Sequence, residues 1–305
     1  MSLEELGPPP VAHARTASAK RHLVGLLLSP HTETHLSESV AWFQETAWAR
    51  GYDVLTYSIR SQKQQAMPYL RMLLERRVEA IASLILDPGP DLMEALSSVE
   101  VPVVCFDAVH AIRKVASLSI DYGHGVREAV QHLALLGHRE IAFIGGTLQC
   151  RTMRSKSEAF LLSLKEIGCT PKTGWLIETD DSFAGGMQSM QRLLELSPRP
   201  TAVMCSGDAV TLGALWALGQ TRIAVPEEVS LICLDACRFC DDFVPPITTV
   251  QIPIKEFSGT AVDALKYLIE DPLRRVPKSA LRVQTSLIVR GSTTYPLGRA
   301  LPRID

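Results

Sequence analysis

Residues 126–146, VREAVQHLALLGHREIAFIGG, decide the fold of this chain. Apolar side chains recur in the first half at helical spacing and predict one buried helix face: Val126, Ala129, Val130, Leu133 and Leu136. Gly137 can adopt a positive φ and is expected to end this helix. The apolar run 141–144 then predicts a buried strand that opens onto Gly145 and Gly146. In open α/β sheets, ligands bind at such carboxyl ends of strands.

The same helix and strand unit recurs along the chain. Apolar runs without polar alternation predict strands at 23–28, 80–86, 101–106, 141–144, 202–205 and 230–234. Helical faces lie between these runs, and the longest regular one begins after Pro253. This alternation predicts an α/β fold with two lobes, each a doubly wound parallel sheet.

Composition narrows the class of protein. The chain has 305 residues, of which 46% are hydrophobic and 21% charged, which is typical of a globular protein with two domains. A net charge of -2 argues against a surface built to hold nucleic acid. Seven scattered cysteines argue against a disulfide framework and favour a cytoplasmic location. The apolar runs are too short for a membrane span, and residues 1–10 lack the apolar core of a signal peptide.

Five short motifs carry a family resemblance. They are RGYD at 50–53, LERRV at 74–78, LGHREIAFIGG at 136–146, VPEEVS at 225–230 and VRGS at 289–292. In this order and spacing, they make residues 23–292 resemble the effector-binding core of the LacI/GalR family of transcriptional regulators.

The resemblance implies a periplasmic-binding-protein-like fold of type I, in which three crossovers join the two lobes and the ligand lies between them. The first lobe is expected to hold 23–120 and 250–280, and the second 121–249 and 281–296, with a tail at 297–305. The resemblance also implies a homodimer, and we expect an isologous interface mostly from the first lobe. We expect no cofactor and no metal.

The N-terminal segment 1–22 is expected to be a hinge or linker remnant. Its prolines at 8–10 remove backbone donors, and a basic, Ala- and Ser-rich stretch follows. Family members carry a helix-turn-helix headpiece before the hinge, and 22 residues are too few for both. We therefore expect this chain to bind effector and to dimerise, while operator DNA is bound only through the missing headpiece.

The resemblance and the predicted strand ends together place the ligand site. The first lobe is expected to contribute His35 and Leu36 from the first strand-to-helix loop, and Asp107 after the strand that ends at 106. The second lobe is expected to contribute Arg151, Thr152, Arg154, Lys156, Asp181, Asp208 and Asp235. Of these, Thr152 and Lys156 match family ligand contacts. Carboxylates that accept from hydroxyls and cations that donate suit a polyol or another small polar metabolite.

Six of these residues also have a purely structural interpretation. Asp208 could cap a helix, and Asp107 and Asp235 could be turn residues. Arg151, Arg154 and His35 could be solvated surface side chains. If Asp107 and Asp235 bridge the two lobes, replacing Asp235 by alanine should weaken ligand binding by about 1.5–3 kcal/mol and leave the fold intact.

Departures from the family pattern leave the effector open. Gly207 stands where sugar-binding members usually have asparagine, and Ala236 stands where a second aspartate is common. Lys156 replaces an arginine fork by a point charge, and Asp181 replaces a position that is often aromatic. The tryptophans on predicted helices are expected to be packing residues: Trp42, Trp48 and Trp216.

The sequence gives weaker evidence for a metal site or a catalytic site. Cys233, Cys237 and Cys240 include a Cys-x-x-Cys spacing, but no nearby histidine completes a zinc site, so buried or loop thiols are the default. No catalytic arrangement can be read from spacing, and we expect a regulator rather than an enzyme. The alternatives are a periplasmic sugar-binding protein of a transporter and an α/β enzyme acting on a sugar or nucleotide.

Overall fold

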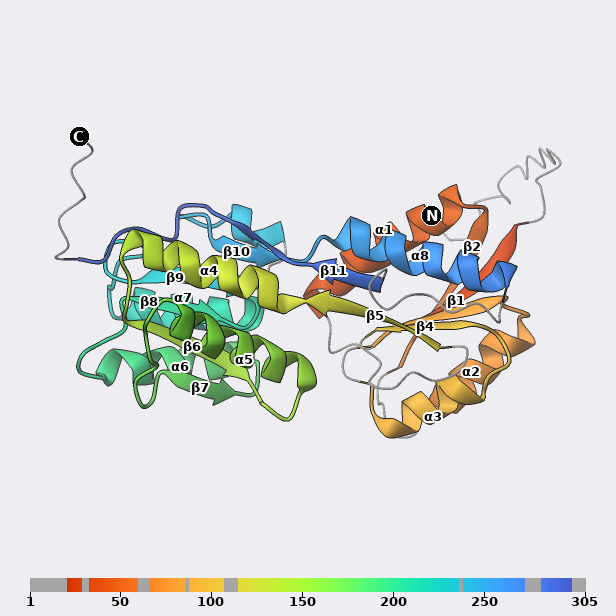
Figure 1. The fold of residues 1–305 in the computed structure, drawn as a ribbon, viewed down its shortest axis with the longest axis horizontal. Coiled ribbons are helices and arrows are strands. Elements are labelled where there is room, and N and C mark those ends of the chain that lie inside the picture. The colour runs from red at the N-terminus through yellow and green to blue at the C-terminus, as the bar shows by residue number, and fades with distance from the viewer. Residues whose placement is uncertain are drawn as a thin grey trace, which may run out of the picture.

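The computed structural model describes residues 21–28, 33–59, 66–85, 88–106, 115–235, 238–271 and 281–297, apart from the side chains of 33–37 and 238–239. They form two lobes side by side along the long axis of the molecule, each a six-stranded sheet with helices on both faces (Figure 1). The predicted α/β architecture with two parallel-dominated sheets is therefore confirmed. Asp107 and Ala236 lie outside the described residues.

The first lobe has a sheet in the order β11-β5-β4-β3-β1-β2, in which every pairing is parallel. Its strands are β1 (His22–Leu28), β2 (Tyr52–Ser58), β3 (Ala80–Leu84), β4 (Val103–Phe106), β5 (Val115–Asp121) and β11 (Arg282–Gln284). The helices are α1 (Glu33–Ala49), α2 (Ala66–Glu75), α3 (Pro90–Ser98) and α8 (Ile254–Glu270). One core joins Phe43 of α1 and Phe257 of α8 to the sheet, and another joins Leu70 of α2 and Leu96 of α3.

The second lobe has a sheet in the order β12-β10-β9-β8-β6-β7, in which only β12 runs antiparallel to its neighbour. Its strands are β6 (Ile141–Gly146), β7 (Leu176–Thr179), β8 (Ala202–Cys205), β9 (Ser230–Leu234), β10 (Thr248–Gln251) and β12 (Ser286–Ile288). The helices are α4 (Tyr122–Leu136), α5 (Arg151–Glu166), α6 (Phe183–Glu195) and α7 (Asp208–Gln220). The core under α4 and α5 contains Phe143 and Phe160, and the core under α6 and α7 contains Met190 and Ala214.

Within the described ranges the chain passes between the two sheets three times: from β5 into α4, from β10 into α8, and from β11 into β12. The expected lobe boundaries shift by a few residues at all three places, since Asp121 ends β5 and pairs with Gln284 in the first sheet. Residues 250 and 251 belong to β10 of the second sheet, and β11 pairs with β5 in the first sheet. The first lobe therefore extends to Gln284. The sequence did not predict this boundary, because β11 is a short edge strand with a single apolar residue, Val283.

Within residues 126–146, Gly137 ends the helix and His138 anchors the turn that follows it. Gly137 has φ 98° and ends α4, and its N–H donates to the Ala134 carbonyl. The His138 side chain is buried, with Nδ1 2.8 Å from Thr201 Oγ1 and Nε2 donating to the Thr294 carbonyl at 2.7 Å. The motif therefore ties the end of α4 to β8 and to the segment after β12.

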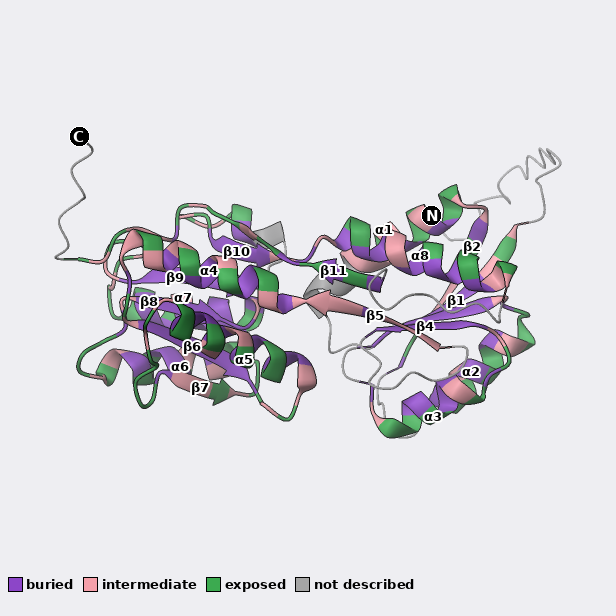
Figure 2. Cartoon of the chain, viewed as in Figure 1, coloured by how far each residue is buried: buried purple, intermediate pink, exposed green. Residues whose placement is uncertain are grey.

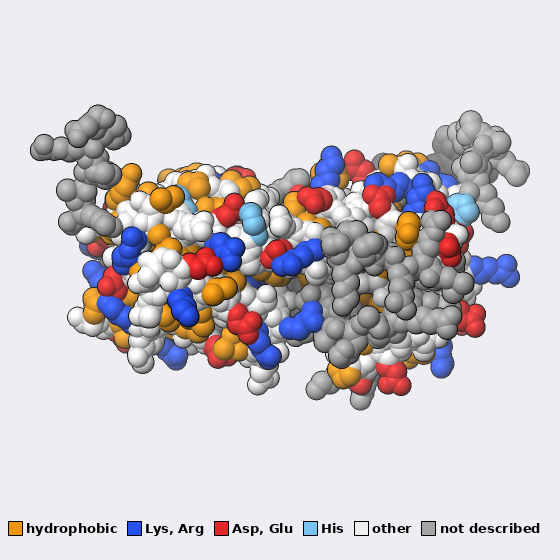
Figure 3. All heavy atoms as spheres, in the orientation of Figure 1, with side chains coloured by type: hydrophobic (Ala, Val, Ile, Leu, Met, Phe, Trp, Pro, Cys, Tyr) orange, Lys and Arg blue, Asp and Glu red, His pale blue; other side chains and the backbone are white. Residues whose placement is uncertain are grey.

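Burial follows the pattern expected for strands covered by helices on both faces, with one core on each side of each sheet (Figure 2). The face of the molecule in Figure 3 carries acidic and basic side chains interspersed, without a single-sign field. Among the described residues, no helix has both the length and the apolar character that crossing a bilayer requires.

His132 predicts a pH-dependent stability. Its Nε2 lies 2.9 Å from Thr293 Oγ1, and burial lowers its pKa below the ordinary 6.5. Below pH 6.5 the unfolded chain therefore binds a proton at His132 more readily than the folded chain does. The contribution of neutral, buried His132 to the free energy of unfolding is fully present above pH 6.5 and is lost as the pH falls toward the folded-state pKa. Thermal unfolding across this range should show a shallower acid loss for His132→Gln than for the unmodified chain. If the unfolding temperatures of the two proteins fell in parallel with pH, His132 would not contribute to the acid loss of stability.

Candidate functional site

The candidate site lies where three neighbouring strands of the second sheet end. Strands β6, β8 and β9 are adjacent and parallel, so their carboxyl ends meet at one edge. Gly146 ends β6, Ser206 follows β8 and Asp235 follows β9. Helix α5 begins after β6 and carries Thr152 and Lys156 four residues apart, which places them on one helix face.

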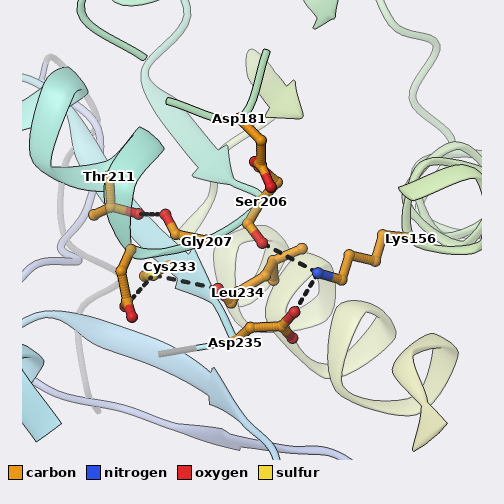
Figure 4. A network of polar contacts seen from close by, with 9 residues as sticks. Lys156, Asp181, Ser206, Gly207, Thr211, Cys233, Leu234 and Asp235 are labelled. Atoms are coloured by element: carbon orange, nitrogen blue, oxygen red, sulfur yellow. Dashed lines mark hydrogen bonds and ion pairs between the residues drawn. The ribbon is translucent and has the colours of Figure 1, made fainter. Parts of the chain in front are cut away.

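Lys156 is the centre of the site. Its residue is fully buried, and its ammonium pairs with the Asp235 carboxylate and donates to the Ser206 carbonyl at 3.2 Å (Figure 4). The ammonium also lies 4.7 Å from the centroid of the Tyr122 ring, a cation–π distance. The Asp235 side chain is 16% exposed and the Lys156 side chain 1%, so the acidic residue of the pair lies nearer the surface.

Asp181 extends the polar edge toward β7. The Ser206 hydroxyl donates to Asp181 Oδ1 at 2.7 Å. Asp181 and Asp235 both have left-handed backbones, with φ of 60° and 56°. Such a conformation is unfavourable for most residues, and aspartate is among those that tolerate it best. These two backbone bends follow β7 and β9, where the Asp181 carboxylate accepts from Ser206 and the Asp235 carboxylate pairs with Lys156.

Thr152 presents a buried hydroxyl beside Lys156. The residue is 4% exposed, and within the described part of the chain its Oγ1 has no hydrogen-bond partner. A buried hydroxyl without a partner is unfavourable by about 1–3 kcal/mol. A ligand atom that bonded Thr152 would relieve this.

The structure brings Lys156, Asp181 and Asp235 together around Ser206, with Thr152 one turn before Lys156 on α5, whereas two other predicted site residues face elsewhere. Arg154 folds back on its own loop, where Nε and Nη2 donate to the Leu148 carbonyl at 3.1 and 3.0 Å. The Asp208 carboxylate accepts from the Cys233 thiol at 3.7 Å. Its alternative role as a helix cap is wrong, because Gly207 occupies the N-cap position and Asp208 is the first helical residue.

The other predicted residues are placed less closely. Arg151 is half-buried at the start of α5. His35 and Leu36 lie in the first turns of α1 rather than in a loop, because α1 begins at Glu33, and their side chains are outside the described set. Asp107 lies outside the residues that the structure describes.

Sequence reasoning missed Ser206 and Tyr122. Ser206 directly follows the predicted strand 202–205, so its position at a strand end was a readable signal. Tyr122 is buried at the start of α4, and its contact with Lys156 comes from tertiary packing alone.

The arrangement suits hydrogen bonding more than chemical reaction. It offers carboxylates as acceptors and an ammonium and hydroxyls as donors, the groups that bind a polyhydroxylated or other polar molecule. Cys205 lies immediately before Ser206, but burial raises the pKa of its thiol to about 12. The Cys205 thiol is therefore protonated at neutral pH and is a poor nucleophile.

Two of the three tryptophans differ from the packing role expected for them, since Trp48 is 61% and Trp216 is 53% exposed. Trp42 is half-buried and packs against a small cluster with Tyr122, Ile252 and Ile254, as expected. The fully packed tryptophan is Trp175, in the core under α6 and α7. Helical periodicity cannot identify the outer face of a helix that is apolar all round, as α7 is.

Comparisons with known proteins identify the family of the chain. The profile of the family described as "Periplasmic binding protein-like domain" matches residues 130–293. The HTH-type transcriptional repressor PurR of Glaesserella parasuis is 27% identical over 273 residues, which cover 88% of this chain and 80% of that protein. The ribose operon repressor of Escherichia coli is 28% identical over 295 residues, 95% of this chain and 88% of that protein.

Solved structures show the same fold. A regulatory protein of the LacI family from Chloroflexus aggregans superposes with a TM-score of 0.79 at 24% identity, covering 90% of this chain and 99% of that one. The Lac repressor dimer bound to operator and the anti-inducer ONPF superposes with a TM-score of 0.77 at 23% identity, covering 94% of this chain and 99% of that one. The chain therefore belongs to the family of periplasmic binding protein-like domains, and its relatives in sequence and fold are transcriptional regulators of the LacI type.

Proposed function

We propose that this chain is the effector-binding and dimerisation core of a cytoplasmic LacI/GalR-type transcriptional regulator and acts without catalysis. The effector is a small polar metabolite of sugar type, bound between the lobes at the strand ends of the second lobe. The observation that carries this proposal is the buried Lys156–Asp235 pair, flanked by Thr152 and the Ser206–Asp181 hydrogen bond.

The chemistry of the site supports a hydroxyl-rich ligand. Asp181 and Asp235 can accept from ligand hydroxyls, while Lys156 and Thr152 can donate to ligand oxygens. A buried polar site discriminates strongly against a ligand that leaves one of its groups unpaired. Gly207 and Asp181 replace an amide and an aromatic ring of the family pattern, so recognition rests on charged groups more than on stacking.

Regulation would follow from a shift between two arrangements of the lobes. An effector that bridges the lobes stabilises one relative angle, and the size of the shift is limited by its differential affinity for the two arrangements. In the intact regulator this angle would set the spacing of two headpieces on operator DNA.

A thermal-shift panel of pentoses, hexoses, polyols, sugar acids and nucleobases tests the proposal. A ligand that binds only the folded state raises the unfolding temperature in a concentration-dependent way. We expect saturable stabilisation by one chemical class of the panel. Stabilisation by none of them, together with turnover of any of them, would instead favour an α/β enzyme.

Dimerisation predicts a second measurable result. Phe183 of α6 is 44% and Trp216 of α7 is 53% exposed, and their ring centroids are 6.4 Å apart. Exposed aromatic pairs of this kind mark protein interfaces. We assign the dimer contact in part to this second-lobe face, in addition to the expected first-lobe contact.

Sedimentation at micromolar concentration should therefore give a dimer, and Trp216→Glu should shift it toward monomer because the change buries a charge at the interface. Leu135→Glu is the matched control, because Leu135 is an exposed apolar residue on α4, away from this face. A monomer before any substitution would favour the transport-protein alternative.

A further inference from the structure

Three metal-ligating side chains converge beside the effector site without taking part in it. They are Asp208 at the start of α7, Cys233 in β9 and Cys240 in the short helix η3 (Arg238–Asp241). One ligand atom from each lies within 4.8 Å of the others, and all three residues are buried.

The spacing of these atoms fits a tetrahedral ion. Zinc binds thiolates at about 2.3 Å and carboxylate oxygens at about 2.0–2.2 Å, so two such ligands stand roughly 3.5–3.8 Å apart. The Cys233 Sγ to Asp208 Oδ1 distance is 3.7 Å. Three protein ligands leave one position for water or another small ligand.

The surroundings favour a compensating cation. Cys233, Cys240 and Ile247 form a small apolar cluster with Leu215 and Phe243 packed against it. A divalent ion would balance the negative charge that two thiolates and a carboxylate bring into this low-dielectric pocket.

We propose that Asp208, Cys233 and Cys240 form a binding site for a thiophilic divalent metal ion of the zinc type. Thiolate ligands select Zn²⁺ and similar soft ions over Mg²⁺ and Ca²⁺. Binding displaces the two thiol protons into solvent and forms two metal–sulfur bonds and one metal–oxygen bond, so affinity should rise with pH.

The site would also brace the effector-binding edge. Asp208 lies two residues after Ser206, and Cys233 lies two residues before Asp235. Those are the two segments that contact Lys156. A bound ion would therefore join the start of α7, the end of β9 and η3 at the place where the second lobe meets its ligand.

Cobalt substitution tests this proposal without any effector. The reduced full chain, freed of metal by a chelator, is titrated with Co²⁺ and followed by absorption. We expect a thiolate-to-cobalt charge-transfer band and the intense visible bands of tetrahedral cobalt, saturating at one ion per chain and abolished by Zn²⁺. The charge-transfer band should be lost in the Cys233→Ser/Cys240→Ser double variant and weakened in each single variant.

Cys169→Ser is the matched control, since Cys169 is a half-buried thiol outside the cluster. It should keep the full band. Asp208→Asn should keep the charge-transfer band but lower the Co²⁺ affinity, because both sulfur ligands remain. Absence of the band in the unmodified chain, a result that does not depend on whether any variant folds, would overturn the proposal. So would an undiminished band in the folded double variant.

Discussion

Replacing Asp235 by alanine is expected to lower the free energy of unfolding by about 3–5 kcal/mol. The substitution leaves the fully buried Lys156 ammonium with the Ser206 carbonyl and the Tyr122 ring but without its carboxylate. Removing one partner of a buried ion pair is strongly destabilising because the other charge stays in a medium of low dielectric. Chemical denaturation of the ligand-free protein measures the loss.

Two further variants separate charge from backbone effects. Asp235→Asn keeps the shape of the side chain and tolerates the φ of 56°, so it should lose most of the same stability if charge is the cause. Lys156→Met should be milder, since the remaining Asp235 side chain is 16% exposed and can be hydrated. If Asp235→Asn were as stable as the unmodified chain, the ion pair would not stabilise the fold. These expectations replace the sequence-based one, in which Asp235 only lined a cleft and the fold survived its loss.

Replacing Gly213 by alanine is expected to lower the free energy of unfolding by about 3 kcal/mol, the upper end of typical overpacking effects. A Cβ at Gly213 would lie 2.0 Å from the Phe183 carbonyl oxygen and 2.6 Å from the Met187 nitrogen. Both are backbone atoms of the neighbouring helix, so α6 and α7 would have to separate. Gly186 makes the reciprocal approach to Val210 of α7.

Gly219 provides the matched control in the same helix. A Cβ there meets nothing within 4 Å, so Gly219→Ala should leave stability unchanged or raise it by up to about 1 kcal/mol. Denaturant titration of both variants compares them directly. Equal stability of the two alanine variants would mean that α6 and α7 do not pack backbone to backbone in solution.

The parts of the fold that the sequence predicted are those buried on both faces. Strands β8 and β9 were predicted residue for residue, because every side chain in them is buried and the apolar run coincides with the strand. Strands β2, β5, β10 and β11 were not predicted. β2 and β5 are largely half-buried, β10 begins with two threonines, and β11 has three residues, so none of the four produces a continuous apolar run.

The sequence predicted which residues stand at individual strand ends of the site, but it did not predict the contacts between those residues. The positions of Asp235 and Lys156 followed from strand ends and from the family resemblance. Their ion pair joins residues 79 apart in the chain, which no local pattern encodes. The direction of Asp208 toward Cys233 likewise depends on how α7 and β9 pack.

The most direct test of the account is the affinity of Thr152→Val for the ligand found in the thermal-shift panel. Valine removes the hydroxyl that has no partner among the described residues and keeps the side-chain shape, so the ligand-free protein should be as stable as before or slightly more so. Ser83→Ala, which removes another buried hydroxyl without a described partner, in β3 of the first lobe, is the control.

If the effector binds at these strand ends, calorimetric titration should show roughly tenfold weaker binding to Thr152→Val, equivalent to a lost hydrogen bond of about 1.4 kcal/mol. Ser83→Ala should bind with unchanged affinity. Undiminished binding to a folded Thr152→Val would contradict the placement of the effector beside Lys156.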